Sequence, residues 1–443
     1  MNILIISFED NRWGAIRLIK ALHDGGAAVA ALCPPDHAMT QTKFLSGRYA
    51  LEQVRSRCKM ESALSQAMRE WRPSLVIPGD ERAIAFLHAL MRRVDTGVST
   101  KLDAASLVVL ARSLGESRHY DTLLMKNETL SLARRLSLRT PEGGSVSSAE
   151  EAMALAKRIG FPVYLKKAFS WAGQGVVRCQ GPEDIVTAFA SMQSSPRDPL
   201  TAALRAWMGR DWYPTSSVVD VQAAIDGTPA LYCLSAWKGV TLAGFAGRKL
   251  RTTHENGPSS VIRLGAHEEM ARISGEMIAA TGATGFMAFD FMVERNTEKA
   301  YLIECNPRPV PCCHLGPRIG VDLSQALIDA LNGEVKPVPP ARHAETVALF
   351  PQEWQRSPAA LADFRGFVDA PDDDEALLAR MMQGAEAARS RSKLQSRMSV
   401  RPPAILPACA SVWTRRAPFR SLPKQVWKNA FVPHGKAARA FRL

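Results

Sequence analysis

The chain has 443 residues, of which 46% are hydrophobic and 22% charged, so it is long enough for two or three domains with cores of their own. Its start lacks the basic segment, apolar stretch and cleavage site of a secretory signal, and no run of about 20 apolar residues predicts a membrane span. These features favour a cytoplasmic localisation.

The formal net charge of +13 is unevenly distributed. Between Leu377 and Leu443 lie 14 of the 56 basic residues and one of the 43 acidic residues. The first 376 residues therefore carry 42 basic and 42 acidic residues. The basicity therefore belongs to a C-terminal tail.

The first quarter of the chain alternates short apolar runs with helical patterns. In chain order these are an apolar run at 2–7, a helix at 13–23, an apolar run at 27–33, a helix at 63–71 and an apolar run at 74–78. Because β-α-β crossovers favour parallel pairing, they predict an α/β fold that begins with a Rossmann-like domain over 1–115. No G-x-G-x-x-G follows the first run, so a dinucleotide site is not indicated.

The middle of the chain predicts further helices and strands. In order we expect a helix at 120–136, a helix ending at Ile159, a strand at 162–166, a glycine-containing loop at 170–175, a β-rich stretch at 218–264, a helix at 268–281, and strands at 286–294 and 300–305. Beyond Pro340 the composition loosens.

The last two of these strands contain polar side chains suited to a metal. If they form an antiparallel hairpin, Asp290 can face Glu304, and Asn306 points the same way as Glu304. Two carboxylates and a carbonyl oxygen suit Mg²⁺, which prefers oxygen ligands and shares its shell with nucleotide phosphates. The competing interpretation is a solvated hairpin, which the apolar neighbours of both carboxylates make less favourable.

The stretch LIECNPRP at 302–309 resembles the closing metal motif of the ATP-grasp superfamily, which includes biotin carboxylase and D-alanine:D-alanine ligase. The resemblance implies an ATP-grasp domain over 116–335, followed by a C-terminal extension over 336–443. It implies that Asp290, Glu304 and Asn306 bind Mg²⁺ or Mn²⁺ and that Arg308 contacts the substrate or a phosphate.

Two lysines occupy positions similar to those of the family. The segment 125–141 resembles the helix whose early lysine binds nucleotide phosphates, which implies this role for Lys126. The segment 160–176 resembles the strand with a second phosphate-binding lysine, Lys166, followed by a small-residue loop. Backbone N–H groups around Gly173 and Gly175 would then cradle phosphate oxygens.

Two further segments resemble parts of the family site. The stretch 220–227 is similar to the hinge that lines the adenine of ATP, with Gln222 at the base edge and Ala223, Ala224 and Ile225 as its walls. This chain has Thr228 and Pro229 where many relatives carry a ribose-binding acid. The segment 245–263 is similar to the one that places arginines over the acceptor site, and Arg248, Arg251 and Arg263 are its candidates.

The resemblance implies a ligase that uses ATP to activate a carboxylate as an acyl phosphate and couples it to an amine or another nucleophile. Two alternatives stay open at this point. One is a carboxylase that acts through carboxyphosphate, and the other is a regulatory protein that binds nucleotide without turnover.

The tail lies outside the resemblance. Its basic residues are interleaved with aromatic ones such as Trp413 and Trp427, which suits an anionic membrane surface or an acidic protein. Nucleic acid is the least favoured partner, because the rest of the chain is neutral overall. The competing interpretation is a tail that packs on the body and exposes a solvated basic face.

Overall fold

The computed structural model describes residues 1–398, apart from 11–12, 53, 55, 170–174, 193–211, 213, 215–217, 255–256 and 337, and gives only the backbone of 391–398. Residues Met1–Lys393 form one unit by their contacts. Helices and strands are mixed along the chain, so the α/β class predicted from the sequence is confirmed.

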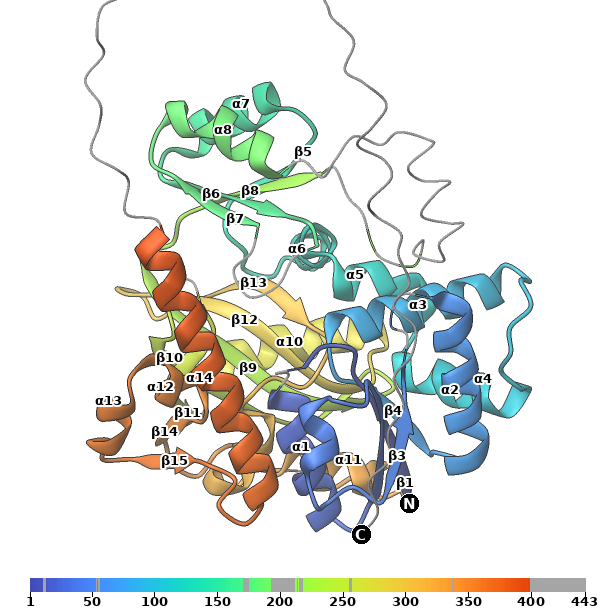
Figure 1. Cartoon of the computed structure of the whole chain (residues 1–443). Helices are drawn as coiled ribbons and strands as arrows, with labels where there is room; N and C mark the ends of the chain where they lie inside the picture. The colour runs from blue at the N-terminus through green and yellow to red at the C-terminus, as the bar shows by residue number, and fades with distance from the viewer. Residues whose placement is uncertain are drawn as a thin grey trace, which may run out of the picture. The chain divides into compact units, whose positions relative to one another are not determined.

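The first apolar runs form a parallel sheet with the strand order β3-β2-β1-β4. Ile3 lies opposite Val29 on one side and Leu75 on the other, and all three side chains are fully buried. The strands are β1 (Asn2–Ile6), β2 (Ala28–Cys33), β3 (Gly47–Ala50) and β4 (Leu75–Pro78). The helices around this sheet (Figure 1) are α1 (Trp13–Asp24), α2 (Arg57–Trp71), α3 (Glu81–Asp95) and α4 (Ala104–Leu114).

The stretch predicted as one helix over 120–136 is divided at Met125, so the prediction of a continuous helix is wrong. The two helices are α5 (Tyr120–Leu124) and α6 (Lys126–Arg135). Met125 has extended backbone angles, with φ −102° and ψ 123°. The amide of Lys126 donates to the carbonyl of Ala168 at 2.9 Å, which ties the start of α6 to the end of a strand.

That strand belongs to a second, antiparallel sheet with the order β5-β8-β6-β7. Its strands are β5 (Gly143–Val146), β6 (Val163–Lys167), β7 (Val176–Cys179) and β8 (Val219–Ala223). Leu165 and Val221 share a core with α7 (Ala149–Ile159) and α8 (Pro182–Met192), which cover one face (Figure 1). Because side chains alternate along a strand, Lys166 and Asp220 project from the other face.

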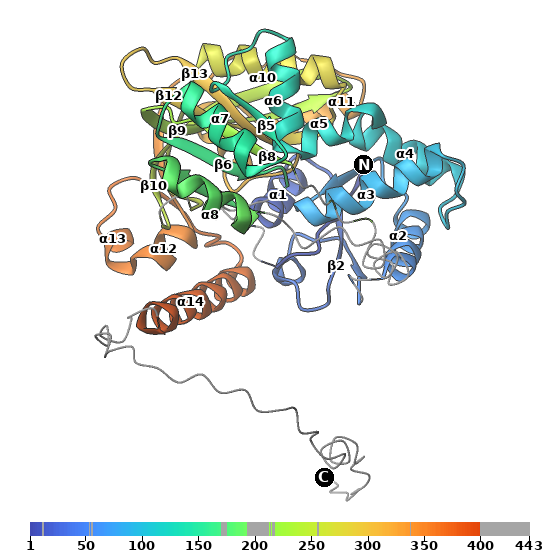
Figure 2. The same cartoon turned by 90° about the horizontal axis from the view of Figure 1, so that it is seen from above.

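The third sheet has seven strands in the order β13-β12-β9-β10-β11-β14-β15. They are β9 (Gly227–Trp237), β10 (Val240–Thr252), β11 (Ser259–Gly265), β12 (Gly285–Glu294), β13 (Ala300–Asn306), β14 (Glu345–Leu349) and β15 (Phe367–Asp369). One face packs on α10 (Glu268–Thr281), where Phe289 and Phe291 lie, and the other packs on α1 and α11 (Leu323–Leu331) (Figure 2).

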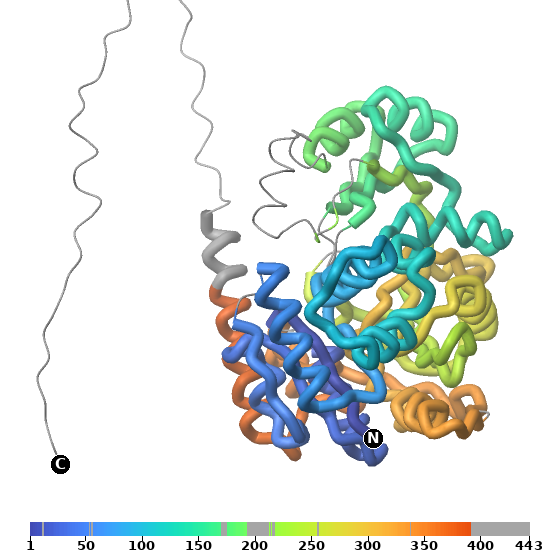
Figure 3. Tube along the Cα trace, turned by 90° about the vertical axis from the view of Figure 1, so that its right-hand side faces the viewer, coloured from blue at the N-terminus to red at the C-terminus, as the bar shows by residue number. Residues whose placement is uncertain are grey.

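The chain after residue 336 therefore contributes two strands to this sheet. It also forms α14 (Glu375–Met398), which buries Leu377, Met381 and Ala385. Arg380 of α14 pairs with Asp10 of the first domain, and Figure 3 shows α14 running beside the N-terminal elements. No helix among the described residues is both long and apolar enough to cross a bilayer.

Gly14 of α1 packs against the backbone that follows β13, where a Cβ would lie 2.5 Å from the Val310 carbonyl carbon and 2.6 Å from the Pro309 oxygen. We expect Gly14→Ala to lower the free energy of unfolding by about 1–3 kcal/mol, because α1 or this backbone must shift. Urea denaturation measures the change.

Gly275→Ala in α10 is the matched control, because the nearest atom outside the adjoining helix backbone, Thr241 Oγ1, would be 3.9 Å from the new Cβ. Helix propensity should leave its stability unchanged or raise it by up to about 1 kcal/mol. Equal destabilisation in the two variants would show that the close approach at Gly14 is not the cause.

Candidate active site

Two carboxylates face each other across the β12–β13 hairpin, because Asp290 lies directly opposite Glu304. The pairing then skips Ile303, and this β-bulge turns Leu302 toward α10 while Glu304 and Asn306 keep the face of Asp290. Asn306 Nδ2 donates to Asp290 Oδ2 at 3.2 Å. The structure thus brings Asp290, Glu304 and Asn306 together.

Three lysines surround this carboxylate pair. Lys126 Nζ lies 2.6 Å from Glu304 Oε2, and Lys249 Nζ lies 3.1 Å from Asp290 Oδ1. Lys166 is buried beside them, and its charge interacts with those of Glu304 and Lys126. A carboxylate removed from water is stable in its ionised form only with a cationic partner or hydrogen bonds, and the lysines supply both.

Local structure determines where each lysine points. Lys126 is the first residue of α6, at the break after α5. Lys166 lies on β6 opposite Asp220 of β8, on the face that α7 and α8 leave uncovered. Lys249 projects from the same face of the large sheet as Asp290 and reaches it across β9.

Burial is the largest influence on the pKa values in this cluster. Burial lowers the pKa of Lys166 to about 8, although the negative charge of Glu304 acts to raise this pKa. Burial raises the pKa of Asp290, while Lys249 lowers it and Glu304 raises it. Burial would also raise the pKa of Glu304, but Lys126, Lys166 and Lys249 outweigh it and hold that pKa below its usual range. Glu304 is therefore ionised at neutral pH.

Arg308 connects the hairpin to α3. Its Nη2 lies 2.5 Å from Glu81 Oε1, with only 12% and 8% of the two side chains exposed. Glu81 is the first residue of α3, and the preceding Asp80 caps that helix. Asp80 Oδ2 also accepts hydrogen bonds from the Ser7 hydroxyl and the Phe8 amide, so one carboxylate fixes the end of β1 and the start of α3.

Arg248 and Arg263, which were expected over the acceptor site, lie away from this cluster. They are opposite each other on β10 and β11, on the face of the sheet that points away from Lys249. Arg248 pairs with Glu298 in the hairpin turn, and Arg263 is exposed. Lys249, one residue beyond Arg248, occupies the face expected for them. Arg251 also pairs elsewhere, with Glu353 at 3.2 Å.

The stretch expected to line the adenine forms hydrogen bonds within the β5-β8-β6-β7 sheet and its flanking residues. Gln222 Nε2 donates to Asp220 Oδ2 at 2.6 Å. The amides of Ala223 and Ala224 donate to carbonyl oxygens of the residues that precede β5 and β6, and Ile225 follows β8 outside regular structure. The Gln222 side-chain amide nitrogen and the backbone N–H groups of Ala223 and Ala224 therefore donate within the protein itself.

Of the two loop glycines, Gly173 lies outside the described residues. Gly175 has a left-handed φ of 72°, and its carbonyl accepts a hydrogen bond from the Lys167 amide at 2.8 Å. A Cβ there would lie 2.9 Å from the Lys167 side chain, so glycine suits both the conformation and the space.

Sequence analysis missed Lys249, Asp220 and Glu81. Asp220 is fully buried opposite Lys166, and its Oδ1 has no hydrogen-bond partner among the described residues. A signal existed for Asp220, because a lone acid inside the apolar run VVDV is unusual. Nothing in the sequence indicates the pairing of Glu81 with Arg308, which lies 227 residues away.

The polar groups of the hairpin fit a divalent cation that prefers oxygen. Asp290 and Glu304 offer carboxylate oxygens, and Asn306 offers a carbonyl oxygen on the same face. No group of three or more His, Cys, Asp or Glu side chains that could hold a metal occurs in the described part of the chain. Three oxygen-bearing side chains are fewer than the six ligands of Mg²⁺, which commonly shares its shell with phosphate or water.

Related sequences share this part of the chain. Residues 126–200, which include Lys126 and Lys166, match the family described as carbamoyl-phosphate synthase L chain, ATP binding domain. The carbamoyl phosphate synthase large chain of Helicobacter pylori is 26% identical over 250 residues, which are 49% of this chain and 21% of that protein. The formate-dependent phosphoribosylglycinamide formyltransferase of Synechococcus is 31% identical over 135 residues, 30% of this chain and 31% of that protein. The chain thus spans less than a third of the length of each of these curated relatives.

Solved structures share the fold. Biotin carboxylase from Campylobacter jejuni, solved as a β-γ-ATP complex, has a TM-score of 0.56 and 16% identity over 77% of this chain and 74% of that one. Carboxyaminoimidazole ribonucleotide synthase from Aspergillus clavatus, complexed with ATP, has a TM-score of 0.56 and 12% identity over 88% and 98%. The chain therefore shares the fold of these enzymes, and its residues 126–200 are similar to the ATP binding domain of the carbamoyl-phosphate synthase L chain.

Proposed function

We propose that this protein is an ATP- and Mg²⁺-dependent ligase that activates a carboxylate as an acyl phosphate and couples it to an amine or another nucleophile. The observation that carries the proposal is the convergence of Lys126, Lys166 and Lys249 on the Asp290–Glu304 pair. These groups come from α6, β6, β10 and the β12–β13 hairpin, so only the folded chain assembles them. The match of 126–200 to an ATP binding domain supports ATP as the phosphoryl donor.

The charges of the cluster suit a polyphosphate with a bound cation. Asp290, Glu304 and Asn306 would hold Mg²⁺, which would supply positive charge to neutralise the transferred phosphoryl group. The hairpin carboxylates would then no longer need Lys126 and Lys249 as partners. Both ammonium groups would be available to phosphate oxygens, as charge-assisted hydrogen bonds.

The Arg308–Glu81 pair is the candidate for the acceptor side. The guanidinium lies next to Asn306, with Nη2 at 3.5 Å from Asn306 Oδ1, and so borders the metal-binding face of the hairpin. It is suited to hold the substrate carboxylate, while Glu81 is suited to accept a hydrogen bond from an amine. Catalysis would depend on positioning and charge, with no covalent intermediate on the protein.

A second candidate is carboxylation through carboxyphosphate, because the matched family is named for carbamoyl-phosphate synthase. One assay distinguishes these proposed functions. ADP release is measured with Mg²⁺ and a panel of amino acids, carboxylic acids and bicarbonate, and hydroxylamine is added to trap acyl phosphate. A hydroxamate that forms only with one carboxylic acid supports the ligase. ADP release that needs bicarbonate alone supports the carboxylase, and no ADP release with any panel member favours a regulatory protein.

We further propose that the basic tail binds an anionic membrane surface or an acidic protein and is separable from catalysis. Its boundary must be chosen with α14 in mind, because Leu377, Met381 and Ala385 belong to the core.

Glu304→Gln should reduce ADP release at least about 100-fold, because it removes one charge from the metal site at constant volume. The thermal midpoint should change little. Glu298→Gln, in the turn of the same hairpin, is the control and should retain wild-type turnover. Wild-type turnover in Glu304→Gln would remove Glu304 from the metal site.

Lys249→Gln and Arg248→Gln test which face of β10 points into the candidate active site. We expect Lys249→Gln to lower turnover by at least about 100-fold, because it removes a cation 3.1 Å from Asp290. Arg248→Gln removes a partly exposed ion pair on the opposite face and should change turnover by no more than about twofold. ADP release at saturating ATP measures both, and the reverse order of effects would refute this assignment of faces.

Removal of residues 399–443 should leave folding and ADP release unchanged and abolish salt-sensitive binding to vesicles that contain phosphatidylserine or to an acidic carrier protein. A truncation after residue 376 should instead unfold the protein, because it deletes buried side chains of α14. Vesicle co-sedimentation, pull-down with the carrier protein and thermal melting measure these outcomes. Loss of activity in the shorter deletion would show that the tail completes the catalytic unit.

A further inference from the structure

Charged side chains also lie on the face of the β5-β8-β6-β7 sheet that α7 and α8 leave uncovered. Asp220 of β8 is directly opposite Lys166 of β6, and the two residues are 0% and 9% exposed. Side chains at directly opposed positions of antiparallel strands project from the same face, with Cβ atoms about 5 Å apart. The carboxylate and the ammonium group are therefore neighbours away from bulk water, and the charge of Asp220 acts on Lys166.

The Asp220 carboxylate uses only one of its two oxygens. Gln222 Nε2 donates to Oδ2 at 2.6 Å, whereas Oδ1 is buried and has no hydrogen-bond partner among the described residues. A buried polar atom without a partner costs free energy. Oδ1 is therefore an acceptor whose capacity the described part of the chain does not use.

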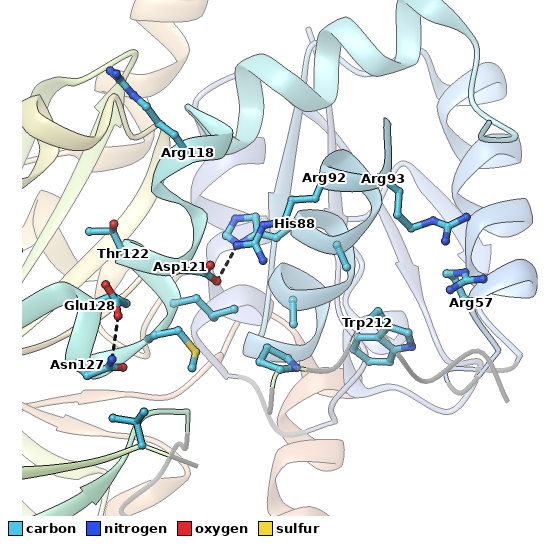
Figure 4. Close-up of a pocket in the computed structure, with 16 residues that line it drawn as sticks. Arg57, His88, Arg92, Arg93, Arg118, Asp121, Thr122, Asn127, Glu128 and Trp212 are labelled. Carbon is cyan, nitrogen blue, oxygen red and sulfur yellow. Dashed lines mark hydrogen bonds and ion pairs between the residues drawn. The ribbon is translucent and has the colours of Figure 1, made fainter. Parts of the chain in front are cut away.

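Other acids near α6 are in a different situation. Beside the start of this helix lies a cavity of about 770 Å³, where Asp121 accepts from Arg92 at 2.7 Å and Glu128 accepts from Asn127 at 2.9 Å (Figure 4). Both acids are exposed, so water can reach their remaining oxygens. Asp220 is not among the described residues that line this cavity, and water does not reach its Oδ1.

Lys166 is the lysine of the active-site cluster that contacts no carboxylate. Lys126 and Lys249 contact the two hairpin carboxylates, whereas Lys166 forms no ion pair with any described residue. Its ammonium group lies 5.9 Å from the centroid of the Tyr164 ring on the same strand. A cation–π contact at this distance is weak compared with the hydration that burial removes. A buried ammonium group and a buried carboxylate oxygen thus share one face, and each can still accept a partner.

Binding of a metal would leave Asp220 as the remaining carboxylate beside Lys166. The carboxylates whose charges act on Lys166 are those of Glu304, Asp220 and Asp290. Under the proposed function, Glu304 and Asp290 would hold Mg²⁺, whose positive charge would offset theirs. Asp220 belongs to another sheet and is not a proposed ligand, so its charge would still be available to Lys166.

Arg134 of α6 is the other cation whose charge acts on Asp220. Burial raises the pKa of Asp220, although the hydrogen bond from Gln222 and the charges of Arg134 and Lys166 act to lower this pKa. The ionised form of Asp220 therefore depends on a nearby cation. Arg134 Nη2 has no hydrogen-bond partner among the described residues, whereas Lys166 is directly opposite Asp220, so the strand register favours Lys166 as the partner.

We propose that Asp220 is a positioning residue for Lys166, whose ammonium group it holds through the unused Oδ1 when nucleotide and metal are bound. A lysine ammonium group has three N–H donors, so one bond to Asp220 leaves two for phosphate oxygens. Without Asp220, the flexible lysine side chain could turn away from the phosphates. This inference rests on the proposed function, because the phosphates belong to it.

A double-mutant cycle on nucleotide affinity tests the proposal. The full chain and its variants Asp220→Asn, Lys166→Met and Asp220→Asn/Lys166→Met are titrated with a non-hydrolysable ATP analogue in the presence of Mg²⁺, and calorimetry gives the dissociation constants. We expect Asp220→Asn to weaken binding about tenfold when Lys166 is present, and no more than about twofold in the Lys166→Met background. If Asp220 only supported the fold, its loss would weaken binding equally in both backgrounds, which would overturn the proposal.

Two further variants complete the cycle. Asp226→Asn removes an acid that follows β8 and is 77% exposed, so it should change the affinity no more than about twofold. Arg134→Gln provides a second background. Loss of the Asp220→Asn effect in that background, rather than in Lys166→Met, would show that Asp220 acts through Arg134 and would also overturn the proposal. The thermal midpoint of each variant shows whether it is folded.

A crystal structure of the wild-type protein with Mg²⁺ and the analogue is a measurement that no variant affects. Lys166 Nζ should lie within about 3.2 Å of Asp220 Oδ1, and a separation above about 4 Å would overturn the proposal. An unchanged affinity in Asp220→Asn would overturn it as well, while the proposed function would stand as long as the wild-type chain binds the analogue. Failure of the wild-type chain to bind the analogue would contradict the proposed function itself, and this inference with it.

Discussion

Two ionised carboxylates on directly opposed positions of neighbouring strands repel each other, and the arrangement of the active site follows from that constraint. Asp290 and Glu304 occupy such positions and are largely buried, so their charges need partners that the hairpin does not supply. Lys126 comes from α6 and Lys249 from β10, and each contacts one carboxylate. The start of α6 and the middle of β10 are thus held to the hairpin by charge as well as by packing.

The N-terminal elements contact the candidate site through a second buried pair. Arg308 follows the hairpin and contacts Glu81 at the start of α3, while Gly14 of α1 allows the next residues, Pro309 and Val310, to pack closely. Asp80 fixes both the end of β1 and the start of α3. The proposed acceptor side would therefore be built by the hairpin and the N-terminal elements together, near loops at the ends of the parallel strands, which is where ligands bind in many α/β folds.

The sequence predicted the elements that carry strong local signals. The helix at 268–281 and the two hairpin strands appear where their patterns indicate, because apolar periodicity and the Arg295–Thr297 turn determine them locally. It did not predict the break at Met125, which depends on a hydrogen bond from Lys126 to Ala168, 42 residues away. The sequence pattern indicated Arg248 rather than Lys249 as a site residue. The face of β10 that meets Asp290 depends on the strand register across β9 and not on residue type. The alternation along β13 also changes at the bulge of Ile303, which no local pattern indicates.

Under the proposed function, the same lysines would make the binding of the nucleotide and the binding of its metal depend on each other. Without ligands, Lys126 and Lys249 neutralise the two carboxylates. A metal ion alone would displace these lysines from their carboxylates and leave buried ammonium groups without partners, which is costly. A triphosphate alone would bring its charge next to Asp290 and Glu304, which repel it. Only the two together give both the carboxylates and the lysines new partners, so the affinity of each ligand should depend on the other through these four side chains.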